Sequence, residues 1–161
     1  MSTIDLVHAL TAAGLTLVTC ESLTAGKLAA TIADVPGASA TLRGGLVTYS
    51  SELKAELAGV DPQLLAASGA VHPEVAAQMA AGAAGRCGAD IALSCTGVAG
   101  PDPQDGQPVG RVFTALFAPG LAAPEVVEHD FAGDRAAIRQ ATVDACLAQL
   151  AEWVRDRWAL S

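Results

Sequence analysis

The sequence predicts an α/β fold, a single three-layer α/β/α domain with a mixed, mostly parallel sheet. Short β-branched apolar runs alternate with Ala-rich segments of helical periodicity, a pattern typical of parallel strands covered by helices. Two strand-like runs then follow each other directly, which makes the sheet mixed. The chain has 161 residues, a length that suits one domain, and 52% of them are apolar although only 4% are aromatic. We therefore expect a core of Ala, Val and Leu in closely packed layers.

The first elements carry clear start signals. Ser2 or Thr3 can cap a helix that runs to about Ala13, because a short polar side chain accepts hydrogen bonds from the first backbone N–H groups. Residues 15–19 form a β-branched apolar run that predicts a buried strand. Residues 26–33 are Ala-rich, with larger apolar side chains at helical spacing, and predict a helix.

The middle of the chain predicts a second strand and three helices. Residues 44–49 form the strand, after a Pro-Gly break. Ser50 or Ser51 can cap a short helix, and Asp61-Pro62 combines a favoured N-cap with proline at the first helical position. His72-Pro73-Glu74 opens a longer helix.

The last part of the chain predicts three strands, two loops and a long helix. The expected elements are a buried strand at 89–95, a glycine-rich loop at 96–101, an exposed loop at 102–108, a strand at 109–117, a half-exposed strand at 124–131, and a helix from residue 133 or 134 to about residue 158.

Charge and composition argue against several classes of partner. Acidic residues outnumber basic ones by 17 to 9, the formal net charge is −8, and no Lys- or Arg-rich run occurs. Nucleic acid is not expected as a partner, because phosphate-backbone binding needs a concentrated basic face. The N-terminus lacks the order of a signal peptide, and no charge-free apolar run reaches the ~18 residues of a membrane span. We therefore expect a cytoplasmic protein without membrane contact.

The four cysteines and three histidines are scattered along the chain. No cysteines form a C-x-x-C pair and three lie in apolar surroundings, which predicts reduced core residues rather than disulfides or zinc ligands. The histidines lie far apart in sequence and are expected to be structural or exposed. We expect neither a metal nor a cofactor.

Residues 19–27 (TCESLTAGK) join the first predicted strand to the helix after it. Ser22 therefore lies at a strand-to-helix turn, where free backbone N–H groups and the positive end of the helix dipole can stabilise an anion or a developing oxyanion. This makes Ser22 a candidate nucleophile. The alternative is that Ser22 or Thr24 is only the N-cap of the helix.

Tyr49 and Lys54 are a second pair of candidates. Tyr49 ends a predicted strand and Lys54 lies in the first turn of the next helix, so both side chains can point into one cleft. A lysine there opposes the helix dipole, which disfavours its ammonium form, and a neutral amine can take a proton from a serine as a general base. The alternative is an ordinary strand tyrosine and a solvated lysine.

Together these segments resemble the C-terminal domain family of the competence/damage-inducible protein CinA. The resemblance covers nearly the whole chain, so residues 1–161 are expected to form one such domain. The matching blocks occur in family order: 21–26 (ESLTAG), 45–50 (GLVTYS), Lys54, 69–71 (GAV), 94–101 (SCTGVAGP), 108–110 (PVG), 133–135 (GDR) and Arg139.

Stand-alone members of this family are nicotinamide mononucleotide amidohydrolases. The resemblance therefore implies hydrolysis of the carboxamide of nicotinamide mononucleotide to nicotinic acid mononucleotide and ammonia, in pyridine nucleotide recycling. It also implies that Ser22 is the nucleophile and that Lys54 and Tyr49 activate it, without a metal or a cofactor. Which of the two takes the first proton stays open.

Further residues are expected to bind the mononucleotide. Arg135 and Arg139 are four residues apart, so they share a helix face on which guanidinium groups can hold a phosphate; the alternative is pairing with nearby carboxylates. The glycine-rich loop at 96–101 can wrap the ligand with backbone N–H groups. The predicted substrate-binding residues are Thr24, Gly26, Thr96, Gly97, Arg135 and Arg139.

The chain departs from the family pattern at two positions of the turn. Leu23 stands where members usually have cysteine, so no thiol is required beside the serine, and Ala25 stands where they have glycine, which adds a methyl group near the predicted ligand. Two other functions stay open: a nucleotide-sensing or protein-interaction domain with little turnover, and a phosphatase or other hydrolase of a related nucleotide. Apolar segments such as 116–118, expected at a sheet edge, also predict a homo-oligomer.

Overall fold

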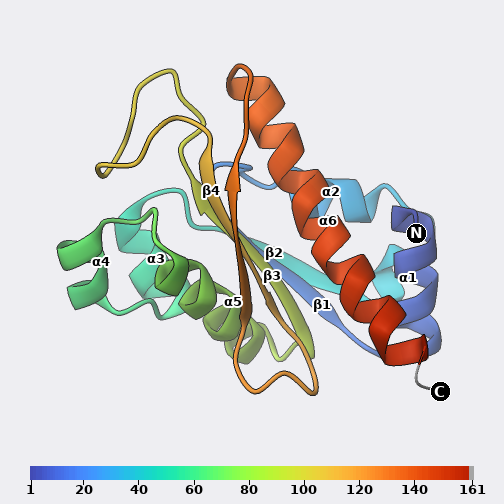
Figure 1. Cartoon of the computed structure of the whole chain (residues 1–161). Coiled ribbons are helices and arrows are strands. Elements are labelled where there is room, and N and C mark those ends of the chain that lie inside the picture. The colour runs from blue at the N-terminus through green and yellow to red at the C-terminus, as the bar shows by residue number, and fades with distance from the viewer. Residues whose placement is uncertain (160–161) are drawn as a thin grey trace.

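A five-stranded sheet lies between two layers of helices in the computed structural model, which describes residues 1–159 (Figure 1). The strands are β1 (Leu17–Glu21), β2 (Leu42–Val47), β3 (Ile91–Gly97), β4 (Arg111–Phe117) and β5 (Glu125–Asp130), in the spatial order β2-β1-β3-β4-β5. β1 pairs parallel with β2 and β3, whereas β4 pairs antiparallel with β3 and β5. Only β4 runs against the others, so the predicted mixed, mostly parallel sheet is confirmed.

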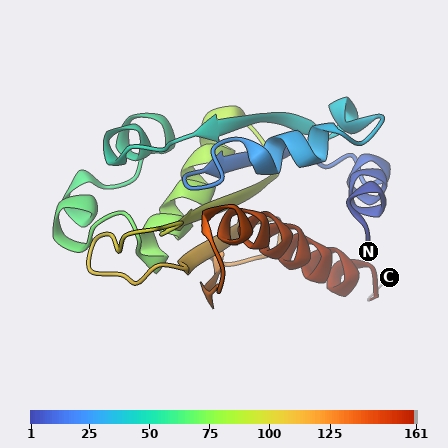
Figure 2. The same ribbon diagram turned by 90° about the horizontal axis from the view of Figure 1, so that it is seen from above.

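Helices cover both faces of this sheet, as Figures 1 and 2 show. One layer consists of α1 (Thr3–Ala12), α2 (Lys27–Ala33) and α6 (Arg135–Ala159), and the other of α3 (Ser51–Ala58), α4 (Pro62–Ser68) and α5 (Pro73–Cys87). A short 3₁₀ helix, η1 (Ala38–Ala40), precedes β2. The predicted three-layer arrangement is confirmed. Within residues 1–159, none of the helices combines the length and the apolar character that crossing a membrane requires.

The pleat of β3 divides the core between the two layers. Ile91 and Leu93 pack on the side of α1, α2 and α6, whereas Ala92 packs on the side of α5. The buried face of α5 is mostly alanine, and a Cβ at Gly82 would overlap the carbonyl oxygen of Ala58 on α3. The Ala-rich, aromatic-poor composition therefore allows helices to pack very closely, as the sequence predicted.

The cysteines belong to this core. Cys20, Cys95 and Cys146 are buried and Cys87 is partly buried, and all four are free thiols. Their placement confirms the interpretation of them as small core residues.

The structure corrects several local expectations. β1 begins at Leu17 and not at residue 15, because the N–H of Thr16 donates to the carboxylate of Asp90 at 2.8 Å rather than to a neighbouring strand. Neither Ser22 nor Thr24 caps α2, whose N-cap residue is glycine. The segment 116–118 does not lie at a sheet edge, because β4 lies between β3 and β5, and Leu116 and Ala118 are buried. This segment does not support the predicted homo-oligomer, which stays a prediction.

The parallel strands bring the predicted catalytic segments to one edge of the sheet. Glu21, the last residue of β1, lies between Val47 of β2 and Cys95 of β3 in the register. The chain that follows each of these strands therefore leaves the sheet at the same edge. In open α/β sheets, ligands bind in this position, outside the carboxyl ends of the strands.

Candidate active site

The turn after β1 presents Ser22 to a cavity. The backbone N–H of Ser22 donates to the carbonyl oxygen of Cys95 at 3.1 Å, and its own carbonyl oxygen accepts from the N–H of Ala25 at 3.1 Å. Ala25 and Gly26 then adopt left-handed backbone, with φ of 50° and 94°, before α2 begins. Ser22 is 8% exposed, and that exposed part lies at the cavity.

Lys54 reaches Ser22 from α3. Its Nζ lies 2.9 Å from Oγ of Ser22, 2.7 Å from the carbonyl oxygen of Thr48 and 3.4 Å from that of Tyr49. Lys54 is only 1% exposed, and burial lowers its pKa to about 8. Loss of water around the ammonium, more than the helix dipole, therefore favours the neutral amine.

The surroundings of Lys54 suit a neutral amine. A neutral amine has two N–H donors and one lone pair, whereas a carbonyl oxygen only accepts and a hydroxyl does both. When the two N–H groups donate to the carbonyl oxygens of Thr48 and Tyr49, the lone pair faces the hydroxyl of Ser22. In the ammonium form, the same Nζ donates to Oγ of Ser22. The pair can therefore pass a proton in either direction, as acid–base catalysis requires.

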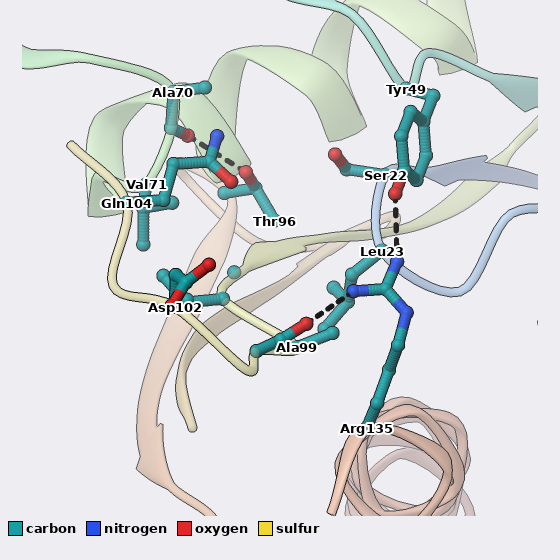
Figure 3. Close-up of a pocket in the computed structure, with 13 residues that line it drawn as sticks. Ser22, Leu23, Tyr49, Ala70, Val71, Thr96, Ala99, Asp102, Gln104 and Arg135 are labelled. Atoms are coloured by element: carbon teal, nitrogen blue, oxygen red, sulfur yellow. Dashed lines mark hydrogen bonds between the residues drawn. The ribbon is translucent and has the colours of Figure 1, made fainter. Parts of the chain in front are cut away.

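The phenol of Tyr49 is bonded to Arg135 and not to this pair. Its hydroxyl accepts from Arg135 at 2.9 Å, and the same guanidinium donates to the carbonyl oxygen of Gly100 at 2.6 Å. Figure 3 shows Tyr49 and Ser22 side by side at the cavity, with the phenol hydroxyl directed to Arg135. Of the two predicted activating residues, Lys54 is the one that contacts the serine hydroxyl, and an activating role for Tyr49 stays a prediction.

The cavity has a volume of about 130 Å³ (Figure 3). Cavities of about 150 Å³ admit benzene, so the space matches one six-membered ring. Thr96 and Gly97 line it at the end of β3, and a Cβ at Gly97 would lie 2.6 Å from the side chain of Val112. The lining residues are Ser22, Leu23, Tyr49, Ala70, Val71, Thr96, Gly97, Val98, Ala99, Gly100, Asp102, Gln104 and Arg135.

The two predicted phosphate-binding arginines have different positions. Arg135 lines the cavity, whereas Arg139 does not. Arg139 donates to the carbonyl oxygens of Leu23 and Thr24 at 2.8 and 3.0 Å. Its guanidinium therefore braces the Ser22 turn, and phosphate binding by Arg139 stays a prediction.

Thr24 and Gly26 also lie outside the cavity lining. Thr24 is fully buried, and its hydroxyl donates to the carboxylate of Glu21 at 2.6 Å. Gly26 is the N-cap residue of α2, in a left-handed conformation that favours glycine. Both residues shape the turn, and their predicted role as substrate contacts stays a prediction.

Leu23 and Ala25, the two departures from the family pattern, also have different positions relative to the cavity. Leu23 is 4% exposed and lines the cavity, so its side chain bears directly on the shape of the space beside Ser22. Ala25 is exposed to solvent and does not line the cavity. Its methyl group bears on the backbone of the turn, where φ is positive.

Sequence reasoning missed the role of Glu21. This carboxylate is fully buried and accepts from the backbone N–H groups of Leu28 and Ala29 at 2.8 and 3.0 Å. These N–H groups of the first turn of α2 are therefore occupied, which corrects the prediction that they are free to bind an anion. The signal was an acidic residue just before a helix whose N-cap position holds glycine, because a helix start favours negative charge.

The loop at 102–108 is largely exposed, as predicted, and it also contributes to the cavity. Asp102 and Gln104 line the cavity, and Asp105 accepts from the backbone N–H of Ala70 at 2.9 Å. Leu23 also lines the cavity, and its backbone N–H has no protein acceptor among the described residues. No group of three or more His, Cys, Asp or Glu side chains in residues 1–159 is arranged to hold a metal ion.

Comparison with known proteins identifies the family. The model of the CinA C-terminal domain matches residues 2–154. A CinA-like protein of Frankia casuarinae is 48% identical over 132 residues, which are 82% of this chain and 30% of that protein. A CinA-like protein of Geobacter sulfurreducens is 47% identical over 145 residues, which are 89% of this chain and 34% of that protein. The chain thus spans about a third of the length of these curated relatives.

Solved structures agree with this match. A CinA superfamily protein from Escherichia coli superposes with a TM-score of 0.89 at 35% identity, covering 94% of this chain and 87% of that one. Another from Klebsiella pneumoniae superposes with a TM-score of 0.88 at 34% identity, covering 97% of this chain and 99% of that one. On the sequence match and the shared fold, the chain belongs to the CinA C-terminal domain family.

Proposed function

We propose that this domain hydrolyses the carboxamide of nicotinamide mononucleotide, giving nicotinic acid mononucleotide and ammonia for pyridine nucleotide recycling. The observation that carries the proposal is the contact of 2.9 Å between Oγ of Ser22 and a buried lysine amine whose pKa is lowered to about 8. A serine and a base within hydrogen-bond reach form the minimal arrangement for nucleophilic acyl transfer.

The first half of the reaction forms an ester. Neutral Lys54 takes the hydroxyl proton of Ser22, and Oγ attacks the amide carbon, so that the carbonyl oxygen becomes an oxyanion. The backbone N–H of Leu23 is the local donor for this oxyanion, because it follows the nucleophile directly and is free of protein acceptors among residues 1–159. One such donor typically lowers the barrier by about 2.7–4 kcal/mol.

The second half returns the proton and releases the product. The ammonium of Lys54 protonates the amide nitrogen as the carbon–nitrogen bond breaks, and ammonia leaves. A water molecule then gives a proton to Lys54 and attacks the ester carbon, and Ser22 recovers that proton from Lys54 as nicotinic acid mononucleotide leaves. Each proton passes through the one Nζ that contacts Oγ.

The cavity supports a substrate of this class. Its volume of about 130 Å³ fits a pyridine ring but not a whole nucleotide, so the ribose and phosphate would extend to the rim. Arg135 is exposed on that rim, and a guanidinium binds phosphate oxygens in a two-pronged way. We therefore assign phosphate binding to Arg135.

The test is release of ammonia from nicotinamide mononucleotide by the purified protein. We expect turnover by the wild type and a loss of at least about a thousandfold in Ser22→Ala and Lys54→Met, since either change removes a member of the pair. Lys27→Met is the matched control, because Lys27 is the only other lysine in the chain and lies outside the cavity. Near-normal rates in either active-site variant would refute the assignment.

The same assay separates the rival functions. Binding of the nucleotide without ammonia release, even at high protein concentration, would indicate a sensing domain. Release of inorganic phosphate in place of ammonia would indicate a phosphatase.

A further inference from the structure

Glu21 joins three parts of the structure that meet at the nucleophile. Its carboxylate accepts from the hydroxyl of Thr19 on β1 at 3.0 Å and from that of Thr24 in the turn at 2.6 Å. It also accepts from the backbone N–H groups of Leu28 and Ala29 at the start of α2. All four partners donate, which matches the acceptor-only character of a carboxylate.

The backbone of Glu21 is also linked by hydrogen bonds to Lys54, the proposed base. Its carbonyl oxygen accepts from the N–H of Thr48 at 2.9 Å, and the carbonyl oxygen of Thr48 in turn accepts from Nζ of Lys54 at 2.7 Å. Glu21 is also the residue directly before Ser22. One residue therefore contacts the elements that carry both members of the pair.

We infer that Glu21 is a positioning residue that holds Ser22 in register with Lys54 by fixing the turn between β1 and α2. The inference rests on the proposed serine mechanism but not on the identity of the substrate. Two features make the carboxylate necessary for this turn. Ala25 and Gly26 have left-handed backbone, and Gly26 offers no side chain to cap the helix.

Replacement of Glu21 by glutamine removes one of the two acceptor oxygens. Each carboxylate oxygen accepts one backbone N–H and one hydroxyl, with Leu28 and Thr24 on Oε1 and Ala29 and Thr19 on Oε2. An amide keeps one of these acceptors and presents N–H groups at the other position. A threonine hydroxyl can rotate to accept, but a backbone N–H cannot, so one N–H at the start of α2 would lose its partner.

The experiment compares Glu21→Gln with the wild type in three measurements. These are kcat and KM for ammonia release, the dissociation constant for the nucleotide by calorimetry, and the rate at which a fluorophosphonate labels Ser22 by mass spectrometry. In the labelling reaction, Oγ bonds to phosphorus, fluoride leaves, and the serine proton passes to Lys54. We expect kcat and the labelling rate to fall about a hundredfold, the typical result of a misplacement of about 1 Å, with the dissociation constant changed less than threefold.

Asp90→Asn is the matched control. Asp90 also accepts from a backbone N–H and a threonine hydroxyl, both of Thr16, at 2.8 and 2.7 Å, but at the opposite end of β1. A carboxylate with a purely structural role should lower the melting temperature and leave labelling unchanged, and this is the expected behaviour of Asp90→Asn. If Glu21→Gln behaves in the same way, or keeps kcat within threefold of the wild type, the inference is refuted.

Further comparisons cover misfolding of Glu21→Gln and failure of the proposed substrate. If Glu21→Gln does not fold, Thr24→Val removes a single donor from the carboxylate, and a labelling rate equal to the wild type would overturn the inference. If the wild type labels at Ser22 but releases no ammonia from nicotinamide mononucleotide, the proposed substrate is wrong, and the labelling rates still test Glu21. If ammonia release is normal in both proteins, only the role of Glu21 fails.

Discussion

Replacement of Lys54 by methionine should abolish turnover and at the same time stabilise the protein at neutral pH. Methionine has a similar length and fills the space of a side chain that is only 1% exposed. It also removes a cation whose burial is unfavourable. An active-site residue that lowers stability is expected where catalysis needs an amine held close to neutrality.

The magnitude follows from the two pKa values. Burial lowers the pKa of Lys54 from 10.5 to about 8, and at about 1.4 kcal/mol per pH unit this difference corresponds to about 3 kcal/mol. Between pH 8 and 10.5 the unfolded lysine still holds its proton and the folded one has lost it. Unfolding therefore takes up a proton in this window, and the free energy of unfolding of the wild type rises with pH. The gain is complete above about pH 10.5 and is lost as the pH falls through about 8.

The assay is urea denaturation of the wild type and Lys54→Met at several pH values from 7 to 10.5. The lost bonds to the two carbonyl oxygens offset part of the benefit, at about 1 kcal/mol each, so we expect the variant to be more stable by about 1–2 kcal/mol at pH 7. This advantage should disappear and reverse as the pH approaches 10.5. The control is Lys27→Met, which should follow the wild type. If the stability difference between the wild type and Lys54→Met does not change with pH, the assigned protonation behaviour of Lys54 is wrong.

Three other predictions concern catalysis and the turn. The value of kcat/KM should rise with pH through an apparent pKa of about 8, because the reaction needs neutral Lys54; a profile flat from pH 6 to 9 would contradict this. Arg135→Ala should raise KM for nicotinamide mononucleotide about tenfold or more, the effect of losing a charged hydrogen bond, and leave KM for the phosphate-free riboside unchanged; equal effects on both would remove the phosphate role. Ala25→Gly should raise the free energy of unfolding by about 0.5–1 kcal/mol, because it relieves a left-handed alanine in an exposed position, and equal or lower stability by urea denaturation would show that the turn carries no strain.

Much of the fold could be predicted from the sequence, because helix starts depend on residues that are close together in the chain. Ser2, Ser50 and Asp61 each accept a backbone N–H at the start of a helix, as their residue types and spacing indicated. The imidazole of His72 also caps a helix, which its residue type did not predict. Strand ends were less predictable, because they depend on partners far away in the chain. The N–H of Thr16, for example, is taken by a carboxylate 74 residues later.

In the candidate site, too, features set by the local sequence could be predicted and contacts between distant residues could not. Ser22 and Lys54 were recognised because each follows a predictable strand and the resemblance joined them. The sequence did not reveal that Arg139 donates to the carbonyl oxygens of the turn, because a backbone acceptor leaves no residue-type signal. The role of Glu21 could not be predicted either. Its partners are two backbone N–H groups and two hydroxyls that become neighbours only when the turn is formed.

The residues proposed to carry out the reaction and those that form much of the remaining cavity wall come from different parts of the sheet. The nucleophile and the base follow β1 and β2, which pair in parallel, so their contact depends on the register that sets Glu21 opposite Val47. Much of the remaining cavity wall comes from residues 97–104, which leave β3 before the chain returns antiparallel in β4, and from Arg135 at the start of α6. Substitutions in this second group can change the ligand without moving the Ser22–Lys54 pair. Relatives that differ there should therefore differ in KM and in preferred substrate, whereas changes at Glu21 or in the β1–β2 register should lower kcat for every substrate.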